Sequence, residues 1–139
     1  MILIINGPNL NLLGKREPDI YGSLSFENYL ETLRKQFSDK ELVYFQSNCE
    51  GDIIDAIHRY GFAPDCEGIV INPGAYSHYS IAIADAFSSV PARIVEVHIS
   101  NIHARESYRR HSVTAEKADG VIAGLGLPGY ALAISFLTT

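Results

Sequence analysis

The side chains best suited to acid–base chemistry in this sequence are asparagines and histidines that follow apolar runs. Five of them stand at the end of such a run or a few residues beyond it: Asn6, Asn9, Asn72, His78 and His98. An imidazole can take up or release a proton near neutral pH, and an amide can stabilise charge that develops on a substrate oxygen. Their placement predicts a site for acid–base chemistry on a small polar molecule.

Each of these residues also has a purely structural explanation. Asparagine is common in tight turns, because its side chain hydrogen-bonds nearby backbone and it tolerates left-handed backbone angles. His78 and His98 could be histidines whose hydrogen bonds are satisfied inside the fold. The functional interpretation therefore depends on the joint placement of these residues after three different apolar runs.

The segment 6–25 contains a second candidate pair, Arg16 and Tyr21. A tyrosine with its ordinary pKa of about 10 is a poor base, but a nearby guanidinium would stabilise the phenolate. Pro18 between them excludes a continuous helix, so only a loop that folds back could bring them together. Connections of this kind usually have about 2–6 residues, so a longer one that is rich in Leu, Ile and Tyr predicts a functional lid. The alternative is that Tyr21 packs the loop against the domain and Arg16 is solvated.

Arg105 and Arg109 form a third candidate pair. They are predicted to lie on a short helix around 106–111 and to share one face of it. Two guanidinium groups side by side could hold a carboxylate. The alternative is a solvated basic face with Glu106 as its partner.

The elements that must position these residues can be predicted from hydrophobic periodicity. Short β-branched runs predict strands that are covered on both faces: 2–5, 42–45, 68–71, 93–97 and 120–123. Helical spacing predicts the intervening helices: 26–37 with Ser25 as N-cap, a helix around 53–57 ending at a left-handed Gly61, 81–87, 106–111 and 127–137.

This alternation predicts an α/β fold, a flavodoxin-like three-layer sandwich with a five-stranded parallel sheet. The length of 139 residues fits one domain, so we expect residues 1–139 to form a single catalytic domain. Ligands of such folds bind beyond the carboxyl ends of the strands. The asparagines and histidines named above should converge there.

Composition excludes several classes of protein. A net charge of −5 argues against a general nucleic-acid binder, which needs a basic face for phosphates. Cys49 and Cys66 are too few for a disulfide framework and lack the spacing of metal ligands. The N-terminus lacks the features of a signal peptide, and no apolar stretch approaches the roughly 18–20 residues that span a bilayer. We therefore expect a cytoplasmic protein without membrane partners.

Two motifs are set aside because part of each is missing. Gly124–Gly129 has the glycine spacing of a dinucleotide-binding turn, but no acidic residue about twenty positions further on. His98 and His103 lack the helical spacing of a zinc motif. Neither a nucleotide cofactor nor a metal is expected.

Five blocks of sequence in order along the chain carry a family resemblance: Gly7–Gly14 continued by Arg16–Pro18 and Tyr21–Gly22, Asn72–His78, Glu96–Glu106, Arg109–Ser112 and Gly120–Gly126. The chain resembles the type II 3-dehydroquinate dehydratases over essentially its whole length. Ser77 and Tyr79 depart from the threonines found in many relatives, which affects packing at the rim of the site.

The resemblance implies that water is removed from 3-dehydroquinate to yield 3-dehydroshikimate, in the shikimate or quinate pathway. The reaction would be an anti elimination through an enolate that needs no cofactor. Tyr21 would be the base that takes the proton α to the ketone, and Arg16 would favour its phenolate. His98 would protonate the leaving hydroxyl.

The resemblance implies further roles around these groups. Glu96 would orient the His98 imidazole, and Asn9 would stabilise the enolate. The remaining implied substrate contacts are Asn72, His78, Asp85, Ile99, Ser100, Arg105 and Arg109. Among them, Arg105 would support the lid, and Asp85 would reach the site of a neighbouring subunit, since the family forms dodecamers built from trimers.

Two other functions remain open on the residues alone. A flavodoxin-like binding module for a flavin or a partner protein would share the fold but have no turnover. A dehydratase that forms a Schiff base would need a lysine in the site. None of Lys15, Lys35, Lys40 and Lys117 stands at the end of an apolar run.

Overall fold

A parallel sheet forms the centre of the computed structural model, which describes residues 1–15 and 24–139. The described residues form five strands: β1 (Ile2–Asn6), β2 (Leu42–Gln46), β3 (Gly68–Asn72), β4 (Ile94–His98) and β5 (Gly120–Ala123). Their order is β2-β1-β3-β4-β5, and every neighbouring pair is parallel. The flavodoxin-like α/β sandwich predicted from the sequence is confirmed.

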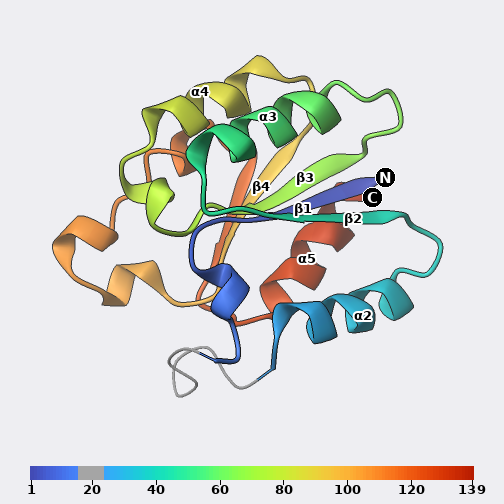
Figure 1. Ribbon diagram of the computed structural model, residues 1–139, viewed down its shortest axis with the longest axis horizontal. Helices are drawn as coiled ribbons and strands as arrows, with labels where there is room; N and C mark the ends of the chain where they lie inside the picture. Colours follow the sequence, from blue (N-terminus) through green and yellow to red (C-terminus); the bar gives the residue numbers. More distant parts are fainter. Residues whose placement is uncertain (16–23) are drawn as a thin grey trace.

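Four α-helices of the described chain cover the two faces of the sheet: α2 (Phe26–Gln36), α3 (Glu50–Gly61), α4 (Ile81–Ser89) and α5 (Pro128–Leu137). In Figure 1, α3 and α4 lie on one side of the sheet and α2 and α5 on the other. Short 3₁₀ turns occupy the connections: η1 (Leu10–Leu12), η2 (Gly74–His78), η3 (Ile102–Ala104), η4 (Ser107–Arg109) and η5 (Ala115–Lys117). The first four follow β1, β3 and β4.

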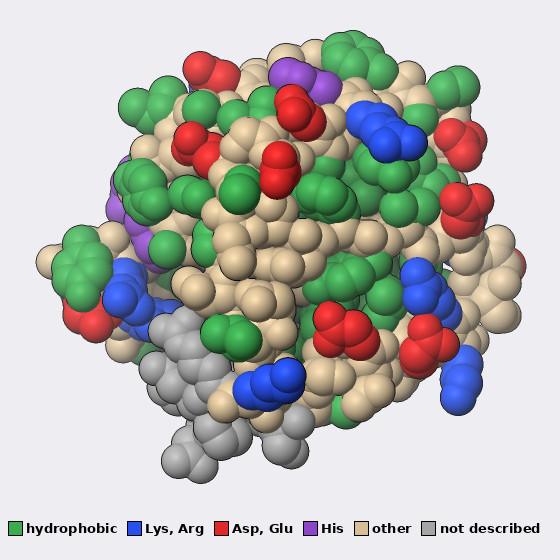
Figure 2. Space-filling model, in the orientation of Figure 1, with side chains coloured by type: hydrophobic (Ala, Val, Ile, Leu, Met, Phe, Trp, Pro, Cys, Tyr) green, Lys and Arg blue, Asp and Glu red, His purple; other side chains and the backbone are tan. Residues whose placement is uncertain are grey.

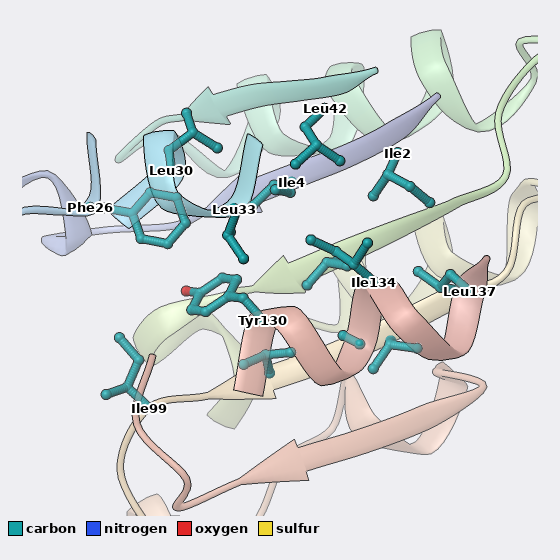
Figure 3. Packing of buried hydrophobic residues seen from close by; sticks show 14 of the residues in the cluster. Ile2, Ile4, Phe26, Leu30, Leu33, Leu42, Ile99, Tyr130, Ile134 and Leu137 are labelled. Carbon is teal, nitrogen blue, oxygen red and sulfur yellow. The ribbon is translucent and has the colours of Figure 1, made fainter. Parts of the chain in front are cut away.

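The core is divided by the sheet into two apolar clusters. Ile2 and Ile4 of β1 pack with α2 and α5, whereas Leu3 and Ile5 belong to the cluster under α3 and α4. Successive side chains of a strand point to opposite faces, so a strand covered on both faces must be apolar throughout. Figure 3 shows the first cluster, in which Tyr130 of α5 lies among aliphatic side chains.

The helix ends agree with the sequence in one case and differ in another. Ser25 caps α2 as predicted, since its hydroxyl accepts the backbone N–H of Asn28 at 3.2 Å. The prediction of a left-handed Gly61 is wrong, because Gly61 is the last residue of α3 and is absent from the glycines with positive φ. Glycine is needed there for space: a Cβ would lie 2.8 Å from the Cβ of Val90.

The predicted helix over 106–111 is also wrong. Only the 3₁₀ turn η4 forms, and Arg105 precedes it in extended backbone, with φ −110° and ψ −174°. Arg105 and Arg109 therefore do not share a helix face. The physical reason is that an isolated single turn is unstable without an apolar stripe to pack against the domain.

Within the two ranges that the structure describes, no helix combines the length and apolar character needed to cross a bilayer.

Candidate active site

A cleft of about 530 Å³ lies beyond the carboxyl ends of β1, β3 and β4. Eight residues predicted from the sequence line it: Asn9, Asn72, His78, His98, Ile99, Ser100, Arg105 and Arg109. The described lining residues include no Asp or Glu, so the cleft favours an anionic ligand. In Figure 2, Lys or Arg side chains (blue) and His side chains (purple) are visible at the left edge, beside the segment coloured orange in Figure 1.

Two asparagines at the ends of neighbouring strands are joined below the cleft by a tyrosine. Asn6 pairs with Asn72 in the register of β1 and β3, where the strand order reverses. The hydroxyl of Tyr130 donates to Asn6 Oδ1 at 2.7 Å and accepts from Asn72 Nδ2 at 3.2 Å. Burial raises the pKa of Tyr130 above its ordinary value, so the phenol keeps the proton that it donates.

Tyr130→Phe is expected to lower the free energy of unfolding by about 1–3 kcal/mol, because the buried Asn6 Oδ1 and Asn72 Nδ2 lose the bonds that they make to the Tyr130 hydroxyl. Tyr44→Phe is the matched control, since the Tyr44 hydroxyl is only partly buried and accepts one long bond of 3.4 Å from Asn6. Its expected cost is under about 1 kcal/mol. Urea unfolding at one protein concentration measures both. An equal loss of unfolding free energy in the two variants would show that the bonds of Tyr130 to Asn6 and Asn72 stabilise the fold no more than the single bond of Tyr44.

His98 is the best-oriented imidazole at the cleft. It is the last residue of β4 and is only 6% exposed, and its Nε2 lies 2.7 Å from Glu96 Oε2. Glu96 precedes it by two positions on the same strand, so both side chains point to the same side of the sheet. The carboxylate itself is fully buried behind the ring and does not line the cleft. This pair can hold an imidazole in one orientation for proton transfer.

Asn9 stands at the mouth of the cleft in strained backbone. Its φ of 69° is left-handed, the conformation that asparagine tolerates better than most residues. Its backbone N–H donates to Asn48 Oδ1 at 3.1 Å, and Gln46 Nε2 donates to the same oxygen at 3.1 Å. The turn explanation is confirmed for Asn9, and the same turn places the residue in the lining of the cleft.

The loops after β1 and β3 approach each other closely at a glycine. A Cβ on Gly7 would lie 2.5 Å from the carbonyl oxygen of Pro73. Only glycine lets these two backbones pass at this distance. The contact brings Asn9 and the η2 turn into the lining of one cleft.

His78 reaches the cleft from η2. Its Nδ1 lies 2.8 Å from the carbonyl oxygen of His111. A carbonyl can only accept, so Nδ1 carries a proton and Nε2 is the second nitrogen available for a ligand.

The two arginines of the cleft have different surroundings. Arg105 Nη1 donates to Ser100 Oγ at 3.3 Å, and its backbone carbonyl accepts from Arg110 Nε at 2.7 Å. Arg109 is half-buried, with its Nε 3.5 Å from Glu106 Oε2. Both groups reach the same cleft even though they lie on different elements. A carboxylate-bearing ligand fits this charge distribution.

Comparison with known proteins decides the family. The model of the family described as dehydroquinase class II matches residues 1–138. The chain belongs to this family. The resemblance inferred from the five sequence blocks is confirmed, and the chain is an enzyme of the hydro-lyase class.

Individual relatives agree with this assignment. The 3-dehydroquinate dehydratase of Clostridium botulinum is 56% identical over 138 residues, which cover 98% of this chain and 92% of the relative. That of Thermotoga petrophila is 52% identical and covers 98% of this chain and 93% of the relative. The crystal structure of the type II dehydroquinase from Butyrivibrio crossotus has a TM-score of 0.92 and 48% identity, covering 99% of this chain and 97% of that one.

Among the predicted site residues that the structure describes, Asp85 and Glu96 do not line the cleft. Arg16 and Tyr21 lie outside the described residues. Asp85 is exposed on α4 and is absent from the lining. Glu96 is completely buried and contacts His98, which does line the cleft.

Sequence reasoning missed the residues that hold the dehydroquinase site from behind. Tyr130, Ser112 and Thr114 are buried polar side chains bonded to Asn6, Asn72 or Glu96. Tyr130 carries a weak sequence signal, because it is a phenol in a helix that is otherwise apolar on its buried side. Ser112 ends one of the five blocks of the family resemblance without a role assigned to it, and Thr114 carries no signal, since a polar segment outside helices and strands is normally solvated.

The glycines of 124–129 serve the turn into α5 in this enzyme. Gly124 and Gly126 have φ of 86° and 69°, and a Cβ on Gly129 would lie 3.3 Å from Val97. Within the described residues, no group of three or more His, Cys, Asp or Glu is placed to hold a metal ion.

Proposed function

We propose that this chain converts 3-dehydroquinate into 3-dehydroshikimate by anti elimination of water through an enolate, in the shikimate or quinate pathway. The observation that carries the proposal is His98, held by buried Glu96 at the edge of an electropositive cleft. Relatives at 56% and 52% identity named 3-dehydroquinate dehydratase supply the substrate. Residues 1–139 would act as one catalytic domain without a cofactor.

The reaction needs a base and an acid on opposite sides of the substrate. A proton α to a ketone is weakly acidic, so the enolate needs hydrogen bonds already in place, and Asn9 at the cleft could contribute to them. Tyr21, with its phenolate favoured by Arg16, is proposed as the base. Hydroxide is a poor leaving group, so the acid His98 must protonate it.

The substrate carboxylate is proposed to lie near Ile99, Ser100 and Arg109. Ile99 and Ser100 follow β4 directly, next to His98, and all three residues line the cleft. A guanidinium binds a carboxylate with two parallel hydrogen bonds, which orient the ring as well as hold it. Asn72, His78 and Arg105 are proposed as contacts to other groups of the substrate.

Arg109→Ala is expected to raise KM for 3-dehydroquinate about 10- to 100-fold, with a much smaller change in kcat, because it removes a charge-assisted contact made before and during the reaction. Steady-state kinetics measure both constants. Arg59→Ala, an exposed arginine on α3, is the matched control and should leave both unchanged. An unchanged KM in Arg109→Ala would show that Arg109 does not bind the substrate.

The direct test of the function is addition of 3-dehydroquinate to the purified chain. The conjugated product absorbs in the ultraviolet, so its formation is followed continuously. Absence of product would overturn the proposal. A flavin absorbance without turnover would favour the binding module, and inactivation by borohydride only in the presence of substrate would favour a Schiff base.

The chain is proposed to act as an oligomer, a dodecamer built from trimers. Asp85 supports this, because it lies on the exposed face of α4, away from the cleft of its own chain. Ile81, one turn before it on α4, is 68% exposed, and Tyr79, which lies at the rim of the cleft, is 63% exposed. An apolar face of this kind is typical of a protein interface, from which Asp85 would reach a neighbouring cleft.

A further inference from the structure

The buried carboxylate of Glu96 is surrounded by donors from three side chains. Its Oε2 accepts from His98 Nε2 and from Ser112 Oγ, each at 2.7 Å. Its Oε1 accepts from Thr114 Oγ1. Glu96 and Thr114 are completely buried, and Ser112 is 7% exposed. These contacts form a closed network behind the cleft.

The donors of this network fit an ionised carboxylate, although Ser112 Oγ and Thr114 Oγ1 also lie 3.1 Å from each other, where either hydroxyl could donate. A hydroxyl has a single proton, and both hydroxyls use it toward Glu96. Ser112 Oγ accepts in turn from the backbone N–H of Ala115 at 3.0 Å. An ionised carboxylate only accepts, so it matches the three donors that point at it. A buried charge is tolerated only where it is paired and hydrogen-bonded in this way.

The network determines which nitrogen of His98 is available. Because Glu96 accepts at Nε2, that nitrogen carries a proton in both the neutral and the charged ring. Nδ1 is then the nitrogen left for a ligand, and the described residues offer it no hydrogen-bond partner. His98 itself lines the cleft.

We infer that Ser112 and Thr114 are positioning residues for the dehydration, which keep Glu96 an acceptor and thereby reserve Nδ1 of His98 for the substrate. The inference rests on the proposed function. In the step, the charged ring transfers its Nδ1 proton to the leaving hydroxyl. The C–O bond breaks with its electron pair on oxygen, water departs, and the electron pair of the enolate forms the new C=C bond. The neutral ring keeps the proton on its Nε2, and this N–H donates to Glu96 Oε2.

The segment that carries the two hydroxyls is itself attached to the cleft. Val113 N donates to the carbonyl of Ser77 at 2.7 Å, and the carbonyl of His111 lies 2.8 Å from His78 Nδ1. One short stretch of chain, 111–114, therefore orients both imidazoles of the cleft. A local shift of this stretch would change both at once.

Thr114→Val and Thr114→Ser form a matched pair of variants. Valine keeps the shape of threonine and removes the donor, whereas serine keeps the donor and removes a methyl group. We expect Thr114→Val to lower kcat by about tenfold with little change in KM, and Thr114→Ser to stay close to the native enzyme. Ser112→Ala, which removes the donor to Oε2, should show the same loss of kcat and serves if Thr114→Val does not fold.

The ¹⁵N spectrum of the imidazoles in the free protein gives a readout that a merely structural role would not change. The His98 signals are assigned by their absence in His98→Asn. Neutral His98 should carry its proton on Nε2 in the native protein. This preference should weaken in Thr114→Val, because the Glu96 carboxylate is no longer held by Thr114 Oγ1 and can turn away from Nε2.

Three results would overturn the inference: a proton on Nδ1 in the native neutral ring, native kcat in both donor-deleting variants, or an equal loss in Thr114→Ser and Thr114→Val. Failure of the proposed function is distinguishable from these. It would appear as absence of turnover in the native chain, while the ¹⁵N spectrum still reports the tautomer.

Discussion

His98→Asn is expected to lower kcat for 3-dehydroquinate about 10²- to 10⁴-fold, the usual contribution of a positioned general acid. The leaving hydroxyl would then depart without protonation. KM should change far less, because His98 contributes mainly while the C–O bond breaks. Steady-state kinetics with ultraviolet detection of product measure both constants.

Exchange of the α proton distinguishes this loss from a general failure of the site. If His98 is only the acid, the variant should still exchange that proton with deuterium from the solvent, since the base remains. His58→Asn, an exposed histidine on α3, is the matched control and should keep native kinetics. Native kcat in His98→Asn would refute its role as the acid.

Tyr21→Phe is expected to lower kcat by a similar factor, about 10²- to 10⁴-fold, while substrate still binds. The phenol is proposed to take the first proton, and phenylalanine has no group that can do so. Steady-state kinetics measure the loss, and calorimetric titration with 3-dehydroquinate measures the binding that remains.

Exchange of the α proton with deuterium from the solvent should distinguish Tyr21→Phe from His98→Asn. Without the base, both deuterium exchange and release of water should stop, whereas His98→Asn loses only the second. Tyr60→Phe on α3 is the matched control and should retain native turnover. Near-native turnover in Tyr21→Phe would show that another residue is the base.

The elements of the fold were predictable because their signals are local. The apolar run of β1 and the Ser25 cap of α2 are both recognised within a few residues of sequence. The predicted run 2–5 ended one residue early, because Asn6 pairs with Asn72 in the backbone ladder whatever its side chain is. Gly61 was misinterpreted because the contact that requires glycine comes from Val90, far along the chain.

The sequence by itself determined the order of strands and helices, and it placed the asparagines and histidines at the strand ends, because buried parallel strands must be apolar and their carboxyl ends share one edge. Only the tertiary structure decided what holds these side chains. Tyr130 reaches Asn6 across 124 positions, and Thr114 reaches Glu96 across 18. Such bonds depend on how elements pack in space, and no periodicity along the chain records which buried hydroxyl meets which carboxylate or amide.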